Sequence, residues 1–144
     1  MNTAEVANLR IEAQECKGDK GLRALQSVFG GASLERRALI MACAKLLSPS
    51  ATLEGSWCAY QLSNGGFFMT PPAPLRIEIP AAGVDLHLCT EAAGVVCSLY
   101  AYERLAELSG GARFVVLRER LMAYARQRPD RTAILECLCQ RDGQ

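Results

Sequence analysis

The residues of this chain that could do chemistry are seven cysteines and a single histidine. The cysteines are Cys16, Cys43, Cys58, Cys89, Cys97, Cys137 and Cys139. No pair has the Cys-x-x-Cys spacing that zinc sites and redox motifs share, so the spacing indicates no metal site. Most of these thiols lie among apolar residues, where cysteine behaves as a small buried hydrophobe.

His87 is predicted to lie in a strand, on the same face as Asp85. Each of the seven cysteines could be proposed as a nucleophile that pairs with His87, so the sequence does not single out one Cys–His pair. The chain also lacks the Gly-x-x-x-x-Gly-Lys-Ser/Thr loop that cradles phosphates. We therefore expect no catalytic residues, no cofactor and no metal, and we keep an enzyme that uses a cysteine with His87 as one alternative.

The composition excludes several classes of protein. The chain has 144 residues, of which 50% are hydrophobic and 22% charged, as is typical of a globular domain. The net charge of +1 lacks the basic excess of a phosphate-tracking protein and the dense carboxylates of a DNA mimic. No run reaches the ~20 apolar residues of a membrane helix. Free thiols and a charged N-terminus predict a cytoplasmic protein without a membrane partner or a small-molecule substrate.

Basic residues gather near the C-terminal end, where residues 110–144 carry seven basic and four acidic side chains. The arginines that could form a basic surface are Arg113, Arg118, Arg120, Arg126, Arg128 and Arg131. They leave open a nucleic-acid-binding accessory protein of a mobile element. However, the aromatic and amide side chains that would contact bases are not interleaved with them, so DNA binding is possible but unsupported.

The order of expected elements predicts an α+β fold. Helical patterns at about 22–29 and 33–47 are followed by strand patterns at 56–62, 67–70, 75–79 and 84–88, and then by helices to the C-terminus. We expect a small antiparallel sheet of about four strands in two hairpins, with helices on its N- and C-terminal sides. Residues 1–21 are interpreted as an arm, either frayed helix or loose chain, and 22–144 as a single domain. Gly94 lies inside a helical pattern, which indicates close packing there.

The stretch from Trp57 to Pro71 combines aromatic residues with an Asn-Gly-Gly turn. It resembles the plasmid antirestriction family of the ArdB/KlcA type, which carries Trp-x-x-Tyr-x-Leu-Ser-Asn-Gly-Gly-Phe-aromatic-Met-x-Pro. The matching residues are Trp57, Tyr60, Leu62, Ser63, Asn64, Gly65, Gly66, Phe67, Phe68, Met69 and Pro71. A second match, at the right distance, is Glu91-Ala92-Ala93-Gly94-Val95-Val96. Weaker matches are Phe29-Gly30 and Arg128-Pro129-Asp130, so the resemblance covers about residues 22–139.

The resemblance implies a small α+β protein encoded on mobile DNA that protects incoming plasmid or phage DNA from host type I restriction endonucleases. It implies no catalytic residues. The expected partner is the type I restriction-modification machinery, contacted directly or indirectly. The sequence indicates neither the subunit that would be contacted nor the oligomeric state.

We expect the partner to contact the tip of the first hairpin, made by Ser63, Asn64, Gly65 and Gly66, with Phe68 partly exposed beside it. A turn of small residues presents backbone donors and acceptors to a partner. The alternative is that the turn only joins two strands, since Asn-Gly turns need no partner to be favoured.

Overall fold

A computed structural model of the chain describes residues 9–108 and 111–138. Its strands are β1 (Ala13–Cys16), β2 (Cys58–Leu62), β3 (Phe67–Thr70), β4 (Leu75–Ile79) and β5 (Val84–Leu88). Its α-helices are α2 (Asp19–Phe29), α3 (Ser33–Leu47), α4 (Thr90–Ala106), α5 (Ala112–Gln127) and α6 (Arg131–Cys137). Two short 3₁₀ turns, Gly30–Ala32 and Pro80–Ala82, complete the list. The predicted α+β class is confirmed.

The strands form two separate antiparallel sheets, β1-β2-β3 and β4-β5. Both predicted hairpins are present, but the expectation of one sheet of about four strands was wrong. Pro71, Pro72 and Pro74 follow β3, and proline has no backbone N–H to donate to a ladder. The chain therefore leaves the first sheet after Thr70 and starts a new pairing at Leu75.

The N-terminal segment is more ordered than the sequence indicates. Residues 13–16, which we expected in a frayed helix or a loose arm, form the edge strand β1 and pair with β2 from Ala13↔Leu62 to Cys16↔Ala59. Helix α2 then begins at Asp19, before the predicted boundary at residue 21. A four-residue strand is too short to show a periodicity, so pairing with a neighbouring strand decides its conformation.

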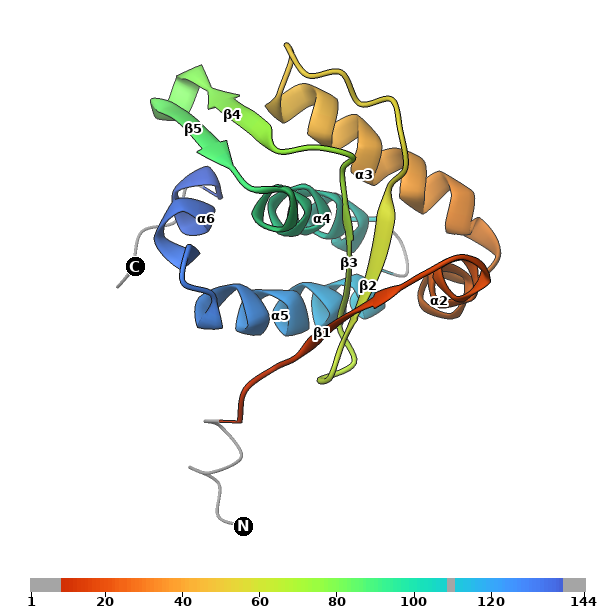
Figure 1. The fold of residues 1–144 in the computed structure, drawn as a ribbon. Helices are drawn as coiled ribbons and strands as arrows, with labels where there is room; N and C mark the ends of the chain where they lie inside the picture. Colours follow the sequence, from red (N-terminus) through yellow and green to blue (C-terminus); the bar gives the residue numbers. More distant parts are fainter. Residues whose placement is uncertain (1–8, 109–110, 139–144) are drawn as a thin grey trace.

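Helix α4 runs through the centre of the molecule, with α3, α5, α6 and both sheets arranged around it (Figure 1). Every residue from Ala92 to Leu99 is buried. Gly94 lies directly against β3, because a Cβ built at this position would be 2.3 Å from the Met69 carbonyl oxygen. The close packing predicted for Gly94 is therefore confirmed.

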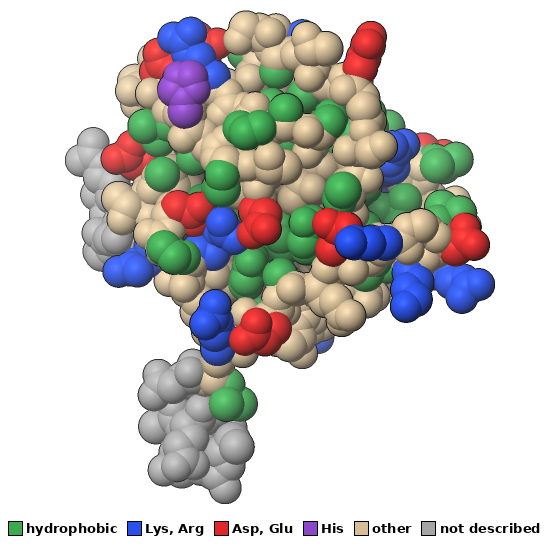
Figure 2. Space-filling model, in the orientation of Figure 1, with side chains coloured by type: hydrophobic (Ala, Val, Ile, Leu, Met, Phe, Trp, Pro, Cys, Tyr) green, Lys and Arg blue, Asp and Glu red, His purple; other side chains and the backbone are tan. Residues whose placement is uncertain are grey.

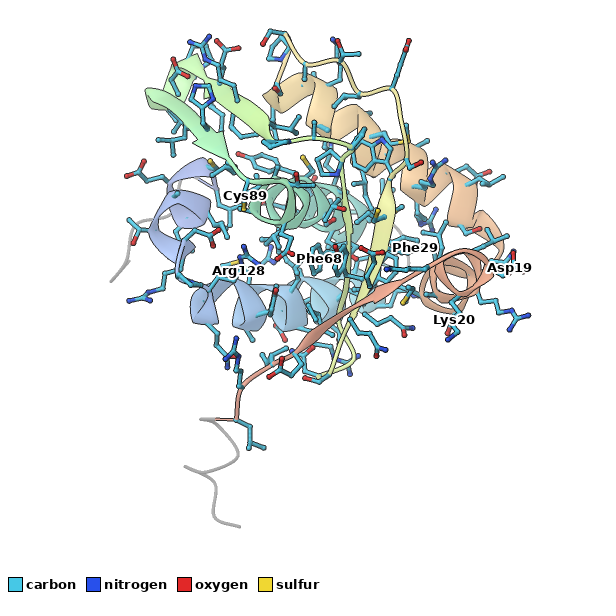
Figure 3. All side chains as sticks on the ribbon, viewed as in Figure 1. Asp19, Lys20, Phe29, Phe68, Cys89 and Arg128 are labelled. Atoms are coloured by element: carbon cyan, nitrogen blue, oxygen red, sulfur yellow. The ribbon has the colours of Figure 1, made fainter. Side chains whose placement is uncertain are left out.

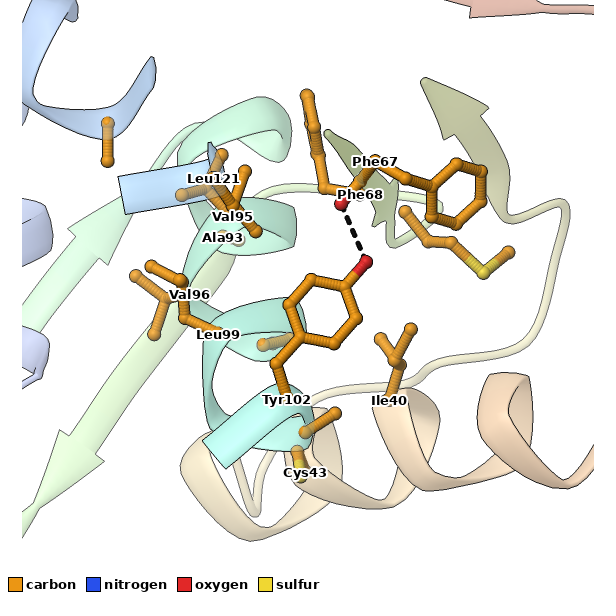
Figure 4. Close-up of a cluster of buried hydrophobic side chains, with 14 of the residues drawn as sticks. Ile40, Cys43, Phe67, Phe68, Ala93, Val95, Val96, Leu99, Tyr102 and Leu121 are labelled. Carbon is orange, nitrogen blue, oxygen red and sulfur yellow. Dashed lines mark hydrogen bonds between the residues drawn. The ribbon is translucent and has the colours of Figure 1, made fainter. Parts of the chain in front are cut away.

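Side chains of α4 also form hydrogen bonds with backbone groups on the outer edge of β3. The buried hydroxyl of Tyr102 donates to the Phe67 carbonyl at 2.6 Å (Figure 4). The Met69 N–H donates to the Ser98 hydroxyl at 3.1 Å. An unpaired backbone group is expensive to bury, so these two bonds allow an edge strand to lie inside the core.

Among the described residues, no helix is both long and apolar enough to cross a membrane.

Candidate functional site

The β2–β3 turn is shaped by its own sequence. The Gly65 N–H donates to the Leu62 carbonyl at 2.9 Å, and the Leu62 N–H donates to the Gly66 carbonyl at 2.9 Å. Gly65 has φ +87°, a conformation that favours glycine. The Asn64 side-chain oxygen accepts from the Gly66 N–H at 2.9 Å. The predicted Asn-Gly-Gly turn is confirmed.

The tip of this hairpin is also held from outside the turn. The Asn64 amide donates to the Arg120 carbonyl of α5 at 3.0 Å, and the Arg120 guanidinium approaches the Gly65 carbonyl oxygen at 3.4 Å. On the other side, Ser63 and Glu12 form a reciprocal pair of 2.9 Å bonds, Ser63 N–H to the Glu12 carbonyl and Glu12 N–H to the Ser63 hydroxyl. The tip is thus a fixed feature of the surface.

The five residues predicted to contact a partner differ in accessibility. Ser63 and Gly65 are exposed, Asn64 is half-buried and Gly66 is buried. Phe68 is fully buried, with 0% of its surface exposed, so the expectation of a partly exposed Phe68 was wrong. Its ring has aromatic partners in the interior, and burying a phenyl ring beside them is strongly favourable.

Phe68 is the middle of a row of stacked rings. The Tyr60 and Phe68 rings stack with centroids 4.9 Å apart, and the Phe68 and Tyr124 rings with centroids 5.7 Å apart. At the sheet end of the row, the Tyr60 hydroxyl donates to the Glu15 carboxylate at 3.1 Å. Burial, with the nearby Glu15 carboxylate, raises the pKa of Tyr60 to about 12. The row therefore joins β1, β2, β3 and α5.

Arg128 lies at the other end of the row. Its guanidinium carbon is 5.7 Å from the Tyr124 ring centroid, and it donates to the Tyr124 hydroxyl at 3.1 Å. It also donates to the Glu91 carboxylate at 3.0 Å and to both Asp130 oxygens, at 2.8 and 3.0 Å. These bonds hold the pKa of Asp130 below its usual range. Arg128 thereby fixes the start of α4 to the end of α5.

Cys89 lies beside this network as the N-cap of α4, where its sulfur accepts from the Ala92 N–H at 3.5 Å. Thr90, which follows it, is the first residue of the helix. Figure 3 shows Cys89 at the start of α4, Arg128 near it at the end of α5, and Phe68 toward the sheet. On the face in Figure 2, acidic and basic side chains gather in groups across the middle of the molecule, with apolar surface between them.

Three of the four segments that carry the family resemblance meet in this region, namely 57–71, 91–96 and 128–130. Tyr60 and Phe68 come from the first segment, Glu91 from the second, and Arg128 and Asp130 from the third. Contacts through Tyr124 and Arg128 connect them. Sequence reasoning did not find the network, although the charged residues in the second and third segments were an indication of it.

The chain is similar to known proteins over most of its length. The family described as "Antirestriction protein" matches residues 53–138. The antirestriction protein KlcA of Escherichia coli is 33% identical over 147 residues, which cover 96% of this chain and 99% of KlcA. This chain belongs to the antirestriction protein family. The coverage shows that the similarity extends into the N-terminal segment that we had placed outside it.

Two further relatives are informative about this antirestriction-family protein. A solved structure of the KlcA and ArdB proteins, described as a novel fold with antirestriction activity against type I DNA restriction systems in vivo but not in vitro, matches with a TM-score of 0.82 at 27% identity. The match covers 96% of this chain and 99% of that one. The uncharacterized protein YafX of E. coli strain K12 is 35% identical over 88 residues, 58% of each chain.

Half of the predicted basic surface has a structural role in this family member. Arg128 is paired with carboxylates, and Arg120 lies against the hairpin tip. Arg113 donates to the Val28 carbonyl, and its guanidinium lies over the Phe114 ring. The geometry therefore does not favour the nucleic-acid-binding alternative.

The surroundings of His87 also give no support to the alternative of an enzyme that uses a cysteine with His87. His87 is exposed on β5, opposite Arg76. Asp85, on the same strand face, forms a two-pronged ion pair with Arg76 at 2.8 and 2.7 Å. Within residues 9–108 and 111–138, His, Cys, Asp and Glu form no group of three that could hold a metal ion.

We expect Arg128→Met to lower the free energy of unfolding by about 2 kcal/mol at pH 7, less than for a fully buried ion pair. The expected loss of stability is smaller because the two carboxylates left without a partner are partly exposed to water. The Glu91 side chain is 48% exposed and the Asp130 side chain is 31% exposed. Asp130 has a lowered pKa when folded, so its contribution is present above its ordinary pKa of 3.8 and is lost as the pH falls.

Urea unfolding at pH 7 and at about pH 3 would check this prediction, with Arg131→Met as the control because Arg131 is exposed on α6. The difference between wild type and Arg128→Met should shrink at the lower pH. An equal effect of the two substitutions at pH 7 would show that the network around Arg128 adds no stability.

Proposed function

We propose that this protein protects incoming plasmid or phage DNA by interfering with host type I restriction in the cytoplasm, and that it does so by binding and without catalysis. The observation that carries the proposal is the match to the KlcA and ArdB structure, which covers 96% of this chain at a TM-score of 0.82. Contact with the restriction machinery is direct or indirect. The test is the plating of unmodified phage on a type I restricting host, with and without this protein.

Activity described as present in vivo but not in vitro for the KlcA and ArdB proteins favours a test in living cells. We therefore expect protection in cells, even if the purified protein does not inhibit a purified restriction enzyme. Host modification should be unaffected, because the proposed interference is with restriction alone.

We further propose that the hairpin tip contacts the partner through Ser63, Asn64 and Gly65, with Gly66 and Phe68 supporting it from beneath. Ser63 and Gly65 are exposed, and bonds to Arg120 and Glu12 hold the tip in one conformation. A fixed conformation supports this role, because less conformational entropy is lost when a partner binds.

We expect Ser63→Arg to reduce protection about tenfold, the effect of losing about 1.4 kcal/mol of contact free energy. The bulky side chain would stand at the exposed tip, where a partner must approach. Ala81→Arg is the matched control, since it places the same side chain at the exposed tip of the β4–β5 hairpin. Protection is measured by phage plating at equal protein abundance.

Equal protection by Ser63→Arg and Ala81→Arg would remove the tip from the partner-binding surface. Gly65→Ala would not isolate the partner contact, because the positive φ of Gly65 and an Arg120 nitrogen 2.9 Å from the added Cβ would strain the turn itself.

A further inference from the structure

A groove lies between α2, α3 and the adjoining ends of β1 and β2, away from the hairpin tip. Its volume is about 440 Å³, and buried Leu25, Ala59 and Met69 form part of its lining. Leu22 of α2 and Leu34 of α3 line it too, although 51% and 69% of their surfaces are exposed. The groove thus has an apolar lining with leucines contributed by two helices.

These two leucines are not explained by the packing of the chain itself. In α2, Leu25 and Phe29 point into the core, while Leu22 stays exposed one turn before Leu25. In α3, Leu34 lies in the first turn, and Arg37 follows it on the same helix face. Single exposed leucines are common on protein surfaces. Two that line the same hollow, together with buried Leu25, Ala59 and Met69, gather apolar side chains at one place on the surface, which is a feature of interaction sites.

Basic side chains border the groove. Lys17 and Arg37 line it, and Lys20 and Arg23 line a second hollow of about 470 Å³ on the other side of α2, which shares Lys17 with the first. Among the described residues, Lys20, Arg23 and Arg37 have no ion pair, and Lys17 has only a 3.9 Å contact with Glu15. Figure 2 shows basic side chains gathered with apolar ones on the side of the molecule where α2 lies.

Acidic side chains do little to balance this charge. Glu15 lines both hollows, and its single negative charge offsets only one of the four positive charges of Lys17, Lys20, Arg23 and Arg37. Asp19 is exposed in the first turn of α2 and lines neither hollow (Figure 3). The groove and its borders therefore combine apolar surface with an excess of positive charge.

We propose that this groove is a docking site for an acidic amphipathic helix of another protein. Such a helix lays its apolar face into a hydrophobic groove, here against Leu22 and Leu34. Its Asp and Glu side chains, on either side of the apolar stripe, then face Lys17 and Arg37, which line the groove. Lys20 and Arg23, which line the second hollow, add positive charge nearby. Charge complementarity of this kind steers encounter and selects acidic partners over basic ones. The inference stands on the groove alone and does not depend on the antirestriction activity.

The test uses the full chain and two synthetic helices, one with leucines on one face and glutamates elsewhere, the other with lysines in place of the glutamates. Fluorescence anisotropy should show binding of the glutamate helix only, weakening as salt is added. Leu34→Glu should weaken binding at least about tenfold. Leu46→Glu is the matched control, since Leu46 lies on the same helix, is 71% exposed and is outside the groove.

The proposal is overturned if the glutamate helix does not bind, if both helices bind equally, or if Leu34→Glu binds like Leu46→Glu. Self-association that Leu34→Glu abolishes would also overturn it, because the occupant would then be a second copy of this chain. Circular dichroism confirms that both variants are folded, which is expected because both leucines are exposed.

Discussion

Gly94→Ala is expected to lower the free energy of unfolding by about 3 kcal/mol, a large effect for one added methyl group. The added Cβ would lie 2.3 Å from the Met69 carbonyl oxygen and 2.8 Å from the Thr70 Cα. Both are backbone atoms of β3, so no flexible side chain can move aside. Helix α4 and β3 would have to separate, which would also disturb the bonds that Tyr102 and Ser98 make to that strand.

Urea or thermal unfolding would measure this effect, with Gly31→Ala as the control. A Cβ at Gly31 would meet nothing within 4 Å, so Gly31→Ala should be neutral or slightly stabilising. If Gly94→Ala proved as stable as Gly31→Ala, the close contact between α4 and β3 would be wrong.

Phe68→Ala is expected to lower the free energy of unfolding by about 4 kcal/mol. Phe68 is fully buried, and its ring stacks against Tyr60 and Tyr124 at centroid distances of 4.9 and 5.7 Å. Removing it leaves a cavity between β2, β3 and α5, and the two flanking rings lose their partner. Loss of folded protein in cells would then lower protection indirectly.

The comparison variant is Val116→Ala on α5, where the side chain is 43% exposed and truncation should change stability by less than about 1 kcal/mol. Denaturant titration of both variants measures how much free energy of unfolding each substitution removes. A Phe68→Ala protein as stable as Val116→Ala would restore the idea that Phe68 is a surface residue.

Local patterns predicted much of the fold. The strands of both hairpins, the turn at Asn64-Gly65 and the close packing at Gly94 each depend on residues a few positions apart. One error came from a long-range contact, and the other from a local feature whose effect on the sheet was misjudged. Strand β1 exists because β2 offers it an edge, and the sheet divides after Thr70 because successive prolines cannot donate hydrogen bonds.

The candidate site shows the same limit. The sequence predicted a turn of small residues, but not that Arg120 and Glu12 hold it from two sides. Exposure of Phe68 was misjudged because position beside a turn does not reveal that Tyr124, far along the chain, covers the ring. The Arg128 network was missed for the same reason, since Glu91 and Arg128 are 37 residues apart.

The central claim is that this member of the antirestriction protein family acts against type I restriction, and the plating efficiency of unmodified phage on a type I restricting host tests it most directly. Cells that make the protein should plate the phage better than cells with an empty vector, while cells that make Phe68→Ala should lose protection together with folded protein. Host modification should remain intact. Plating equal to the empty-vector strain, at good levels of folded wild-type protein, would contradict the proposed function.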